Sequence, residues 1–382
     1  MSYIKVILTA VTVFPIIALI ITLPYILIQY HKYGSVQNIR VAIVYSFIFY
    51  LLTAYFLVIL PLPPIEEVAL YKSDTMQLIP FQFITTFIEN TRVTFNDPTT
   101  YIYFLKDPCS YQVLYNLFLT IPFGIYLRYY YNFSFKKTFI LSFLFSLFFE
   151  LTQLSGLYFI YPRGYRLFDV DDLIINTLGG IIGYFIAPLL EKILPTREEL
   201  DQKSKEKGTK IPLLRRFFSF SFDFFINIIL IIVIYTVTED FIFSYIISIF
   251  IYNYLIPCFT KGKTIFQKFF NLKINTYYIK KNILDEKTSK IALLLRMIWF
   301  YYIFLPLPYY FYLLSNYLFI TYEISSYLIF IFIYIIIIYF NFLRPIIKEK
   351  DIFYEKISRT KLVSTIKVLE KEEDNNEEEC YN

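Results

Sequence analysis

The stretch "FELTQLSGLYFIYPRGYRLFDVDDLIINTLGG", residues 149–180, places charged side chains between two apolar runs. Glu150 lies inside the first run, and the second run begins beside three aspartates and contains a glycine pair. A charged side chain inside hydrocarbon is unfavourable, so such residues are usually paired or functional. The stretch therefore indicates a polar group of residues held between two membrane-spanning helices.

The rest of the chain has the composition of a membrane protein. Of its 382 residues, 57% are hydrophobic and 21% are aromatic, and the mean hydropathy is +0.53. Apolar runs of about 20 residues are long enough to cross hydrocarbon as helices. The sequence predicts an all-α, polytopic transmembrane bundle of about nine spans in two membrane domains. The nine runs are residues 4–30, 41–61, 111–131, 138–160, 173–190, 217–237, 241–259, 298–320 and 324–343.

Loop charges predict the orientation of these spans. Residues 31–40 carry a net charge of +2 and residues 62–110 carry −3, and the sign alternates at every later crossing. Because cytoplasmic loops are enriched in Lys and Arg, we expect the N-terminus outside and the C-terminus in the cytoplasm. The cluster in residues 149–180 then faces outward.

Composition changes along the chain divide it into four parts. We expect a five-helix membrane domain at 1–190, a cytoplasmic linker at 191–212, a four-helix membrane domain at 213–345 and an acidic cytoplasmic tail at 346–382. The tail ends in "LEKEEDNNEEECYN", a composition that predicts disorder.

Several classes of function are disfavoured by composition. The formal charge of +5 comes from basic residues beside membrane segments, so no nucleic-acid partner is expected. Cys109, Cys258 and Cys380 lie in separate regions and predict neither a disulfide nor a zinc site. The single histidine, His31, argues against a Ser-His-Asp triad. We expect no cofactor and no metal.

Helical spacing groups the polar residues of the opening stretch. Glu150 and Gln153 share one helix face, and Asp172 and Asn176 share another. The glycines that follow have a small-xxx-small spacing, which allows helices to approach closely. The sequence predicts a polar pocket that opens outward between two tightly packed helices. Its candidate residues are Glu150, Gln153, Arg163, Arg166, Asp169, Asp171, Asp172 and Asn176. In the alternative, the loop charges are only solvated and the glycines only pack.

These residues resemble the signature of the VanZ-like membrane proteins, a family named for a teicoplanin-resistance factor. The run E-x-x-Q, then R, then D-x-D-D-x-x-x-N-x-x-G-x-x-x-G carries the resemblance, together with "LIPF" at 78–81 and "NLFLTIPFGIYL" from Asn116. It covers about residues 40–190. The resemblance implies a polar set of Glu150, Gln153, Arg166, Asp169, Asp172 and Asn176, and a role in lowered susceptibility to lipoglycopeptide antibiotics.

A second constellation follows the linker. Arg216 and Asp223 are two helical turns apart and share a face, which puts Asp223 about 10 Å deeper along the helix. Residues 260–274, "TKGKTIFQKFFNLKI", predict an amphipathic cytoplasmic segment. Alternatively, this is a basic loop that touches anionic lipid.

Gly262, Lys263 and Thr264 in that segment are not a phosphate-binding P-loop, because its upstream glycine is absent. With the preceding Arg and Asp they resemble the RDD family of membrane domains over about residues 211–343. Arg296 matches a later arginine of that pattern, but no aspartate follows it and Phe266 replaces the second glycine.

The sequence is compatible with three functions. The leading one is a membrane protein, not demonstrably an enzyme, that contacts membrane lipid and a lipoglycopeptide or cell-wall precursor. The second is an ion or small-molecule transporter, because intramembrane acids mark ion pathways. The third is an enzyme on lipid head groups, with Asp169, Asp171 and Asp172 binding a divalent cation and Arg163 and Arg166 binding phosphate.

Overall fold

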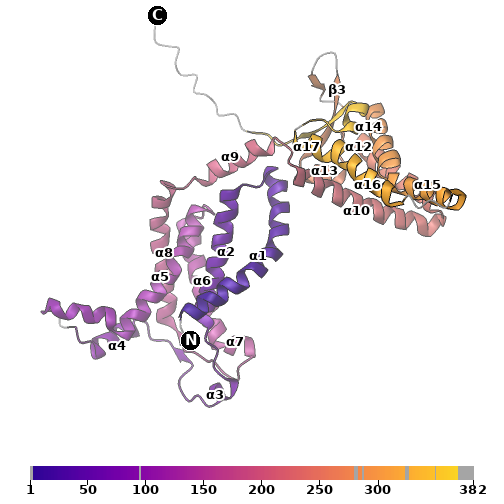
Figure 1. The fold of residues 1–382 in the computed structure, drawn as a ribbon. Coiled ribbons are helices and arrows are strands. Elements are labelled where there is room, and N and C mark those ends of the chain that lie inside the picture. The colour runs from indigo at the N-terminus through magenta and orange to yellow at the C-terminus, as the bar shows by residue number, and fades with distance from the viewer. Residues whose placement is uncertain are drawn as a thin grey trace, which may run out of the picture. The chain divides into compact units, whose positions relative to one another are not determined.

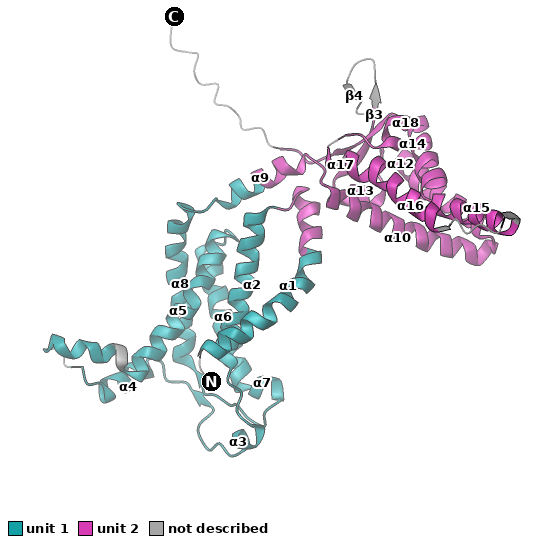
Figure 2. Cartoon of the chain, viewed as in Figure 1, with its two compact units in different colours: residues 1–24, 37–201 teal, residues 25–36, 202–382 magenta. Residues whose placement is uncertain are grey.

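The computed structural model describes residues 3–93, 96–278, 283–285, 288–322, 327–348 and 350–368. These residues are mostly helical and separate into two compact units, coloured separately in Figure 2. Unit 1 comprises residues 1–24 and 37–201, and unit 2 comprises residues 25–36 and 202–382. The first helix therefore contributes residues to both units.

Seven helices of the described chain are long and apolar enough to cross a membrane. They are Ile4–Tyr33, Asn38–Ile59, Phe135–Leu154, Val170–Glu191, Leu213–Thr238, Phe241–Phe259 and Lys290–Ile320. The expected count of nine is therefore only partly supported. The predicted run 111–131 does form a 22-residue helix, but Gln112, Asn116 and Arg128 lower its hydropathy. The last predicted run, 324–343, is described as the shorter helical segment Leu328–Leu343.

Unit 1 is built on five long helices, joined at one end by short elements (Figure 1). The long helices are α1 (Tyr3–Tyr33), α2 (Asn38–Ile59), α5 (Pro108–Tyr129), α6 (Phe135–Leu154) and α8 (Val170–Glu191). The short elements are α3 (Ile65–Ala69), β1 (Met76–Gln77), α4 (Gln82–Asn90), the 3-10 helix η1 (Pro98–Lys106), α7 (Gly156–Phe159) and β2 (Phe168–Asp169). Helix α9 (Arg197–Gly208) forms within the predicted linker.

Glycines set the packing of α8 against α5 and α6. A Cβ atom on Gly124 of α5 would lie 1.8 Å from the carbonyl oxygen of Gly180, and one on Gly183 would lie 2.0 Å from that of Ile121. A Cβ atom on Gly180 would lie 2.1 Å from Ser142 Oγ of α6. Only glycine permits backbones this close. The expected close packing is present, and α5 is the main partner of the glycine face.

Unit 2 combines helices with a small sheet. Its helices are α10 (Leu213–Thr238), α11 (Phe241–Phe250), α12 (Ile256–Phe259), α13 (Ile265–Phe269), α14 (Lys290–Met297), α15 (Leu307–Tyr322), α16 (Tyr327–Ile338), α17 (Arg344–Ile347) and α18 (Phe353–Ser358). Three π-helical segments continue α11, α14 and α16, namely η2 (Ile251–Leu255), η3 (Ile298–Phe304) and η4 (Tyr339–Leu343).

The sheet corrects the all-α expectation. Strands β3 (Leu272–Tyr278), β4 (Ile283–Asp285) and β5 (Thr360–Ser364) pair antiparallel in the order β4-β3-β5. Leu272 and Ile274 alternate into the core, where they pack with Leu362 of β5. Period-two alternation is typical of a half-buried strand. The predicted amphipathic segment 260–274 therefore includes the first residues of strand β3 at its end.

Residues 353–364, placed in the expected acidic tail, form α18 and β5. Strand β5 pairs with β3, and its Leu362 packs in the same core as Leu272 and Ile274 of β3. The acidic stretch 369–382, for which disorder is predicted, lies outside the described residues.

Candidate functional site

The segment "LIPF" and the aspartates of the opening stretch meet at one end of unit 1. Strand β1 pairs parallel with β2, with Gln77 opposite Asp169. The Asp171 carboxylate accepts hydrogen bonds from the backbone N–H groups of Phe81 at 2.5 Å and Phe83 at 2.9 Å. These amides belong to the start of α4, whose first N–H groups have no partner within the helix. Asp171 thus caps α4 from a distant part of the chain.

Asp169 and Glu150 bind backbone N–H groups at the start of α8. The Asp169 side chain accepts from Asp171 N at 2.8 Å and from Gln77 Nε2 at 3.3 Å. Its own backbone N–H donates to Glu150 Oε2 at 2.9 Å, and Glu150 is only 2% exposed. Burial raises the pKa of the Asp169 carboxyl, and the hydrogen bond from Asp171 N opposes this shift.

The two arginines bind backbone carbonyls. Arg163 donates to the carbonyls of Tyr71 and Ser73. Arg166 donates to Val58 O at 2.6 Å and Leu60 O at 3.0 Å. These bonds hold the end of α2 and the loop after it against the cluster.

Gln153 also donates to Val58 O, at 3.2 Å. Across the described chain neither Arg163 nor Arg166 forms an ion pair with Glu150, whose carboxylate holds an N–H group instead. The arginines therefore act on carbonyl groups rather than on the intramembrane acid.

Asp172 and Asn176 face α5 and α6, as their spacing predicts. Asn116 of α5 donates to Asp172 Oδ1 at 2.7 Å, and Asn176 donates to Ser146 Oγ of α6 at 3.0 Å. Ser146 in turn donates to the Asp172 carbonyl at 3.2 Å. The structure therefore brings all eight predicted residues to one end of unit 1. Asn116, Ser146 and Gln77 join them without having been predicted as site residues, although Asn116 and the neighbours of Gln77 lie in the two quoted motifs.

The three aspartate carboxylates bind different backbone or amide groups, and Gln77 Nε2 donates in addition to both Asp169 and Asp171. Asp169 binds the start of α8, Asp171 the start of α4, and Asp172 the Asn116 amide. A divalent cation needs several oxygens converging on one point. Within the described ranges, no group of three His, Cys, Asp or Glu side chains is arranged to hold a metal ion. The metal-dependent lipid enzyme therefore gains no geometric support.

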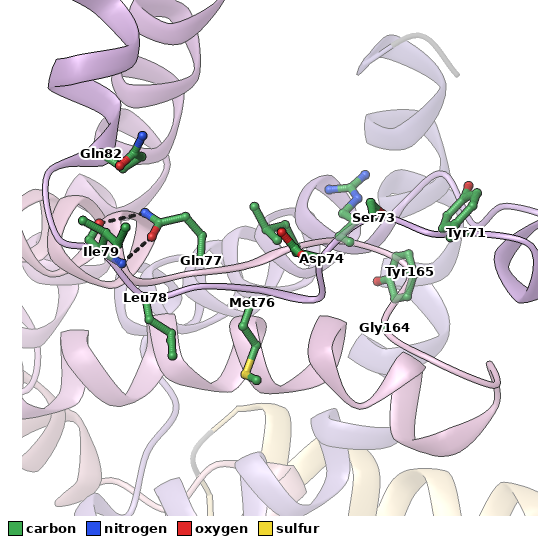
Figure 3. A pocket seen from close by; sticks show the side chains of 12 residues that line it. Tyr71, Ser73, Asp74, Met76, Gln77, Leu78, Ile79, Gln82, Gly164 and Tyr165 are labelled. Carbon is green, nitrogen blue, oxygen red and sulfur yellow. Dashed lines mark hydrogen bonds between the residues drawn. The ribbon is translucent and has the colours of Figure 1, made fainter.

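A cavity of about 730 Å³ lies beside this cluster (Figure 3). Of the eight cluster residues, Arg166 alone lines it. Its apolar rim is exposed to solvent, with Met76 at 50%, Leu78 at 59% and Ile79 at 66% exposure. The lining residues are Tyr71, Ser73, Asp74, Met76, Gln77, Leu78, Ile79, Gln82, Gly164, Tyr165, Arg166 and Leu167.

The second constellation is centred on Asp223 in unit 2. Its carboxylate accepts from Tyr252 OH and Thr264 Oγ1, each at 2.6 Å, and from Phe266 N at 3.2 Å. Thr264 also caps α13 through its bond from Gln267 N. Asp223 and Thr264, two residues that carry the RDD resemblance, are therefore joined in a buried network.

Gly262 and Lys263 shape the turn before Thr264. Gly262 has φ +83°, and a Cβ atom there would lie 2.5 Å from the Ile274 carbonyl oxygen. Burial lowers the pKa of Lys263, with Lys273 and Lys268 adding to this effect. The glycine is therefore required by backbone geometry.

Arg215 carries a role that sequence reasoning did not assign. It is 0% exposed, and it donates to the carbonyls of Phe270 and Asn271 at 2.9 Å and of Gly208 at 2.7 Å. Its neighbour Arg216 lies instead 3.4 Å from Glu355 Oε1, and Arg296 lies 3.7 Å from the same oxygen. Glu355 was also missed, because it lies in the expected tail.

Long apolar helices that enclose a buried polar cluster define a polytopic membrane protein. Residues 47–191 match the family described as VanZ/LLP1, and this part of the chain is a VanZ/LLP1 family domain. The match confirms the VanZ-like expectation for most of unit 1. No curated protein and no solved structure matches the chain.

Proposed function

We propose that unit 1 lowers the susceptibility of the cell to teicoplanin-like lipoglycopeptides by binding the antibiotic at the exterior face of the cell membrane. The observation that carries this proposal is the cavity of about 730 Å³ beside the family's polar cluster. Exposed apolar side chains of its rim lie next to Arg166, Gln77 and Gln82. A ligand with both a polar body and a lipid tail matches such a lining.

Rigidity of the site supports the proposal. The loop 76–83 is held by Asp171, and the loop after α2 is held by Arg166. Binding to a surface that is already ordered avoids the entropy cost of ordering loops. The acids and arginines of the cluster thus serve the cavity by fixing its walls.

Charge at the opposite end of unit 1 supports the outward orientation. Arg40 pairs with Asp201, Arg197 donates to Asp201 at 3.2 Å, and Arg128 donates to the Tyr184 carbonyl at 3.1 Å. Basic residues favour the cytoplasmic side. We therefore infer an exterior position for the cluster, an external N-terminus and a cytoplasmic C-terminus.

The test is antibiotic susceptibility of a strain with and without the protein. Expression of the natural chain should lower susceptibility to teicoplanin but not to vancomycin, which lacks the lipid tail. Arg166→Ala should return the teicoplanin response to that of the strain without the protein. Lys72→Ala, an exposed change on the same loop outside the cavity lining, should retain protection.

Membrane levels of all variants are measured in parallel, so that loss of protein is distinguished from loss of binding. Equal teicoplanin susceptibility with and without the natural chain would reject the proposed role. Full protection by Arg166→Ala would instead show that the cavity has no part in the protection.

For residues 213–345 we propose an RDD-like membrane domain. Support comes from one cavity of unit 2, which is lined by Arg216, Asp223, Thr264 and Arg296, four of the residues that carry the resemblance. Transport through this unit is less well supported, because three donors already bind the Asp223 carboxylate.

A further inference from the structure

Unit 2 contains a cavity of about 490 Å³ with a charged part and an aromatic part. Arg216 lies on one lining face, with Phe220 one turn further along α10. Arg296 begins the other, with Phe300 and Phe304 following at spacings of four residues. Residues four apart lie on one helix face. Both arginines therefore share a helix face with aromatic side chains.

The guanidinium groups keep donors that the protein does not use. Arg216 and Arg296 reach Glu355 Oε1 only at 3.4 and 3.7 Å, while their side chains are 20% and 12% exposed. Arg216 Nε is buried with no hydrogen-bond partner within the described chain. A buried donor without a partner is unfavourable. The parts of the Arg216 and Arg296 side chains that remain exposed belong to the cavity lining, where an anion can bind them.

One acid, Asp223, lines this cavity, and Glu355, which lies outside the lining, contacts both arginines. Asp223 accepts three hydrogen bonds. Glu355 accepts the backbone N–H of Ile352 through Oε2 and lies between the arginines through Oε1. Arg296 is further held by a 2.8 Å bond to Thr360 and by the Tyr354 ring, 4.7 Å away. The guanidinium groups are thus positioned by the fold.

The remaining lining is hydrocarbon and aromatic. Phe304 and Phe342 lie with ring centroids 4.5 Å apart, and Leu305, Ile338 and Leu343 complete this part. A free inorganic anion would leave such a surface without a partner. An amphiphile would use both parts, and the volume falls within the range of about 300–1,000 Å³ of small-molecule sites.

We propose that this cavity binds an anionic membrane phospholipid, with its phosphate on the cavity side of Arg216 and Arg296 and one acyl chain among the phenylalanines. The planar guanidinium matches the geometry of phosphate oxygens. Basic pockets between membrane helices are known acceptors of anionic head groups. This site lies within unit 2 and does not depend on antibiotic binding by unit 1.

The test measures lipid bound to the purified full-length chain. Protein in neutral detergent is incubated with phosphatidylglycerol, phosphatidylcholine or inorganic phosphate, and bound lipid is counted by native mass spectrometry. We expect phosphatidylglycerol to be retained over phosphatidylcholine. Arg216→Gln or Arg296→Gln should each lower its affinity about fivefold, the equivalent of about 1 kcal/mol per basic side chain. Arg344→Gln, at an arginine outside the lining, should change nothing.

A second variant keeps both arginines. Phe304→Trp fills the aromatic part and should reduce phosphatidylglycerol binding while the thermal unfolding of the protein is retained. Equal retention of the two lipids, or unchanged binding in the Arg216→Gln and Arg296→Gln double variant, would overturn the proposal. Inorganic phosphate that displaced the bound lipid completely would also overturn it, because the acyl chain would then contribute nothing.

Discussion

The two units use buried charge in different ways. In unit 1, Glu150, Asp169, Asp171 and the two arginines bind backbone groups where helices begin and end, and Asp172 binds the Asn116 amide. In unit 2, the single carboxylate of Asp223 accepts from three donors, one in η2 and two at the start of α13, and two arginines contact Glu355 beside a cavity. The comparison teaches that a dense polar motif can build a scaffold, while a sparser one leaves donors for a ligand.

The largest effect is expected from Arg215. This residue lies in unit 2, but it binds backbone carbonyls as the arginines of unit 1 do. Arg215→Ala would leave the Phe270 carbonyl without its side-chain donor and remove one of two donors from the Gly208 and Asn271 carbonyls. We expect a loss of about 3–5 kcal/mol of stability. Thermal unfolding of the purified protein measures this loss. Arg344→Ala provides the control, because Arg344 lies on the exposed side and stacks on Phe340. Similar unfolding temperatures for both variants would contradict the assignment.

The next effect concerns the helix contact beneath the unit 1 cluster. Gly124→Ala places a methyl group 1.8 Å from the Gly180 carbonyl oxygen, so α5 and α8 must separate. Overpacking of this kind costs about 1–3 kcal/mol. The result is read from thermal unfolding and from the accessibility of Cys109 to maleimide. Phe118→Leu on the exposed face of the same helix should leave both unchanged, and no change in Gly124→Ala would disprove the close contact.

An effect of the same size but confined to one loop is expected from the cap on α4. Asp171→Ala leaves Phe81 N and Phe83 N without their acceptor, at a cost of about 1–3 kcal/mol. The loop should then become more sensitive to protease than it is in the natural chain. Asp74→Ala, an exposed change in the same loop, is the matched control. Equal cleavage rates in both variants would show that the cap is not needed.

The smallest effect is a pH dependence at Asp169. Burial raises its pKa in the folded protein, so the folded chain binds this proton more tightly than the unfolded chain. Its contribution to stability is therefore lost as pH rises through the carboxyl range. Asp169→Asn cannot ionise and keeps an oxygen that accepts from Asp171 N. Its unfolding temperature should fall less than that of the natural chain from acid to neutral pH, and a steeper fall would contradict this sign.

Much of unit 1 could be predicted from local patterns. Apolar length predicts α2, α6 and α8, and four-residue spacing correctly places Asp172 and Asn176 on one face. The partners of the charges could not be predicted. Arg163 and Arg166 were predicted to share a pocket with Glu150, yet they bind carbonyls of residues far away in sequence. Those contacts depend on tertiary structure, which periodicity does not encode.

Unit 2 was harder to predict because its sheet joins distant segments. Strand β5 pairs with β3 across almost ninety residues of chain, and its place just before the acidic stretch 369–382 suggested a tail. The adjacent arginines 215 and 216 also look equivalent in sequence, but helix geometry turns one into the core and the other toward the cavity. The alternation of Leu272 and Ile274 was the local signal that could have identified the strand.

The central claim is that the unit 1 cavity opens on the exterior face of the membrane, where a lipoglycopeptide can reach it. The most direct test is labelling of intact cells with a membrane-impermeant maleimide, in a chain whose native cysteines are replaced. Asp74→Cys lies in the cavity lining, and Lys136→Cys lies at the opposite end of α6. We predict that Asp74→Cys is labelled in intact cells and Lys136→Cys only after permeabilisation. The reverse pattern would contradict the account.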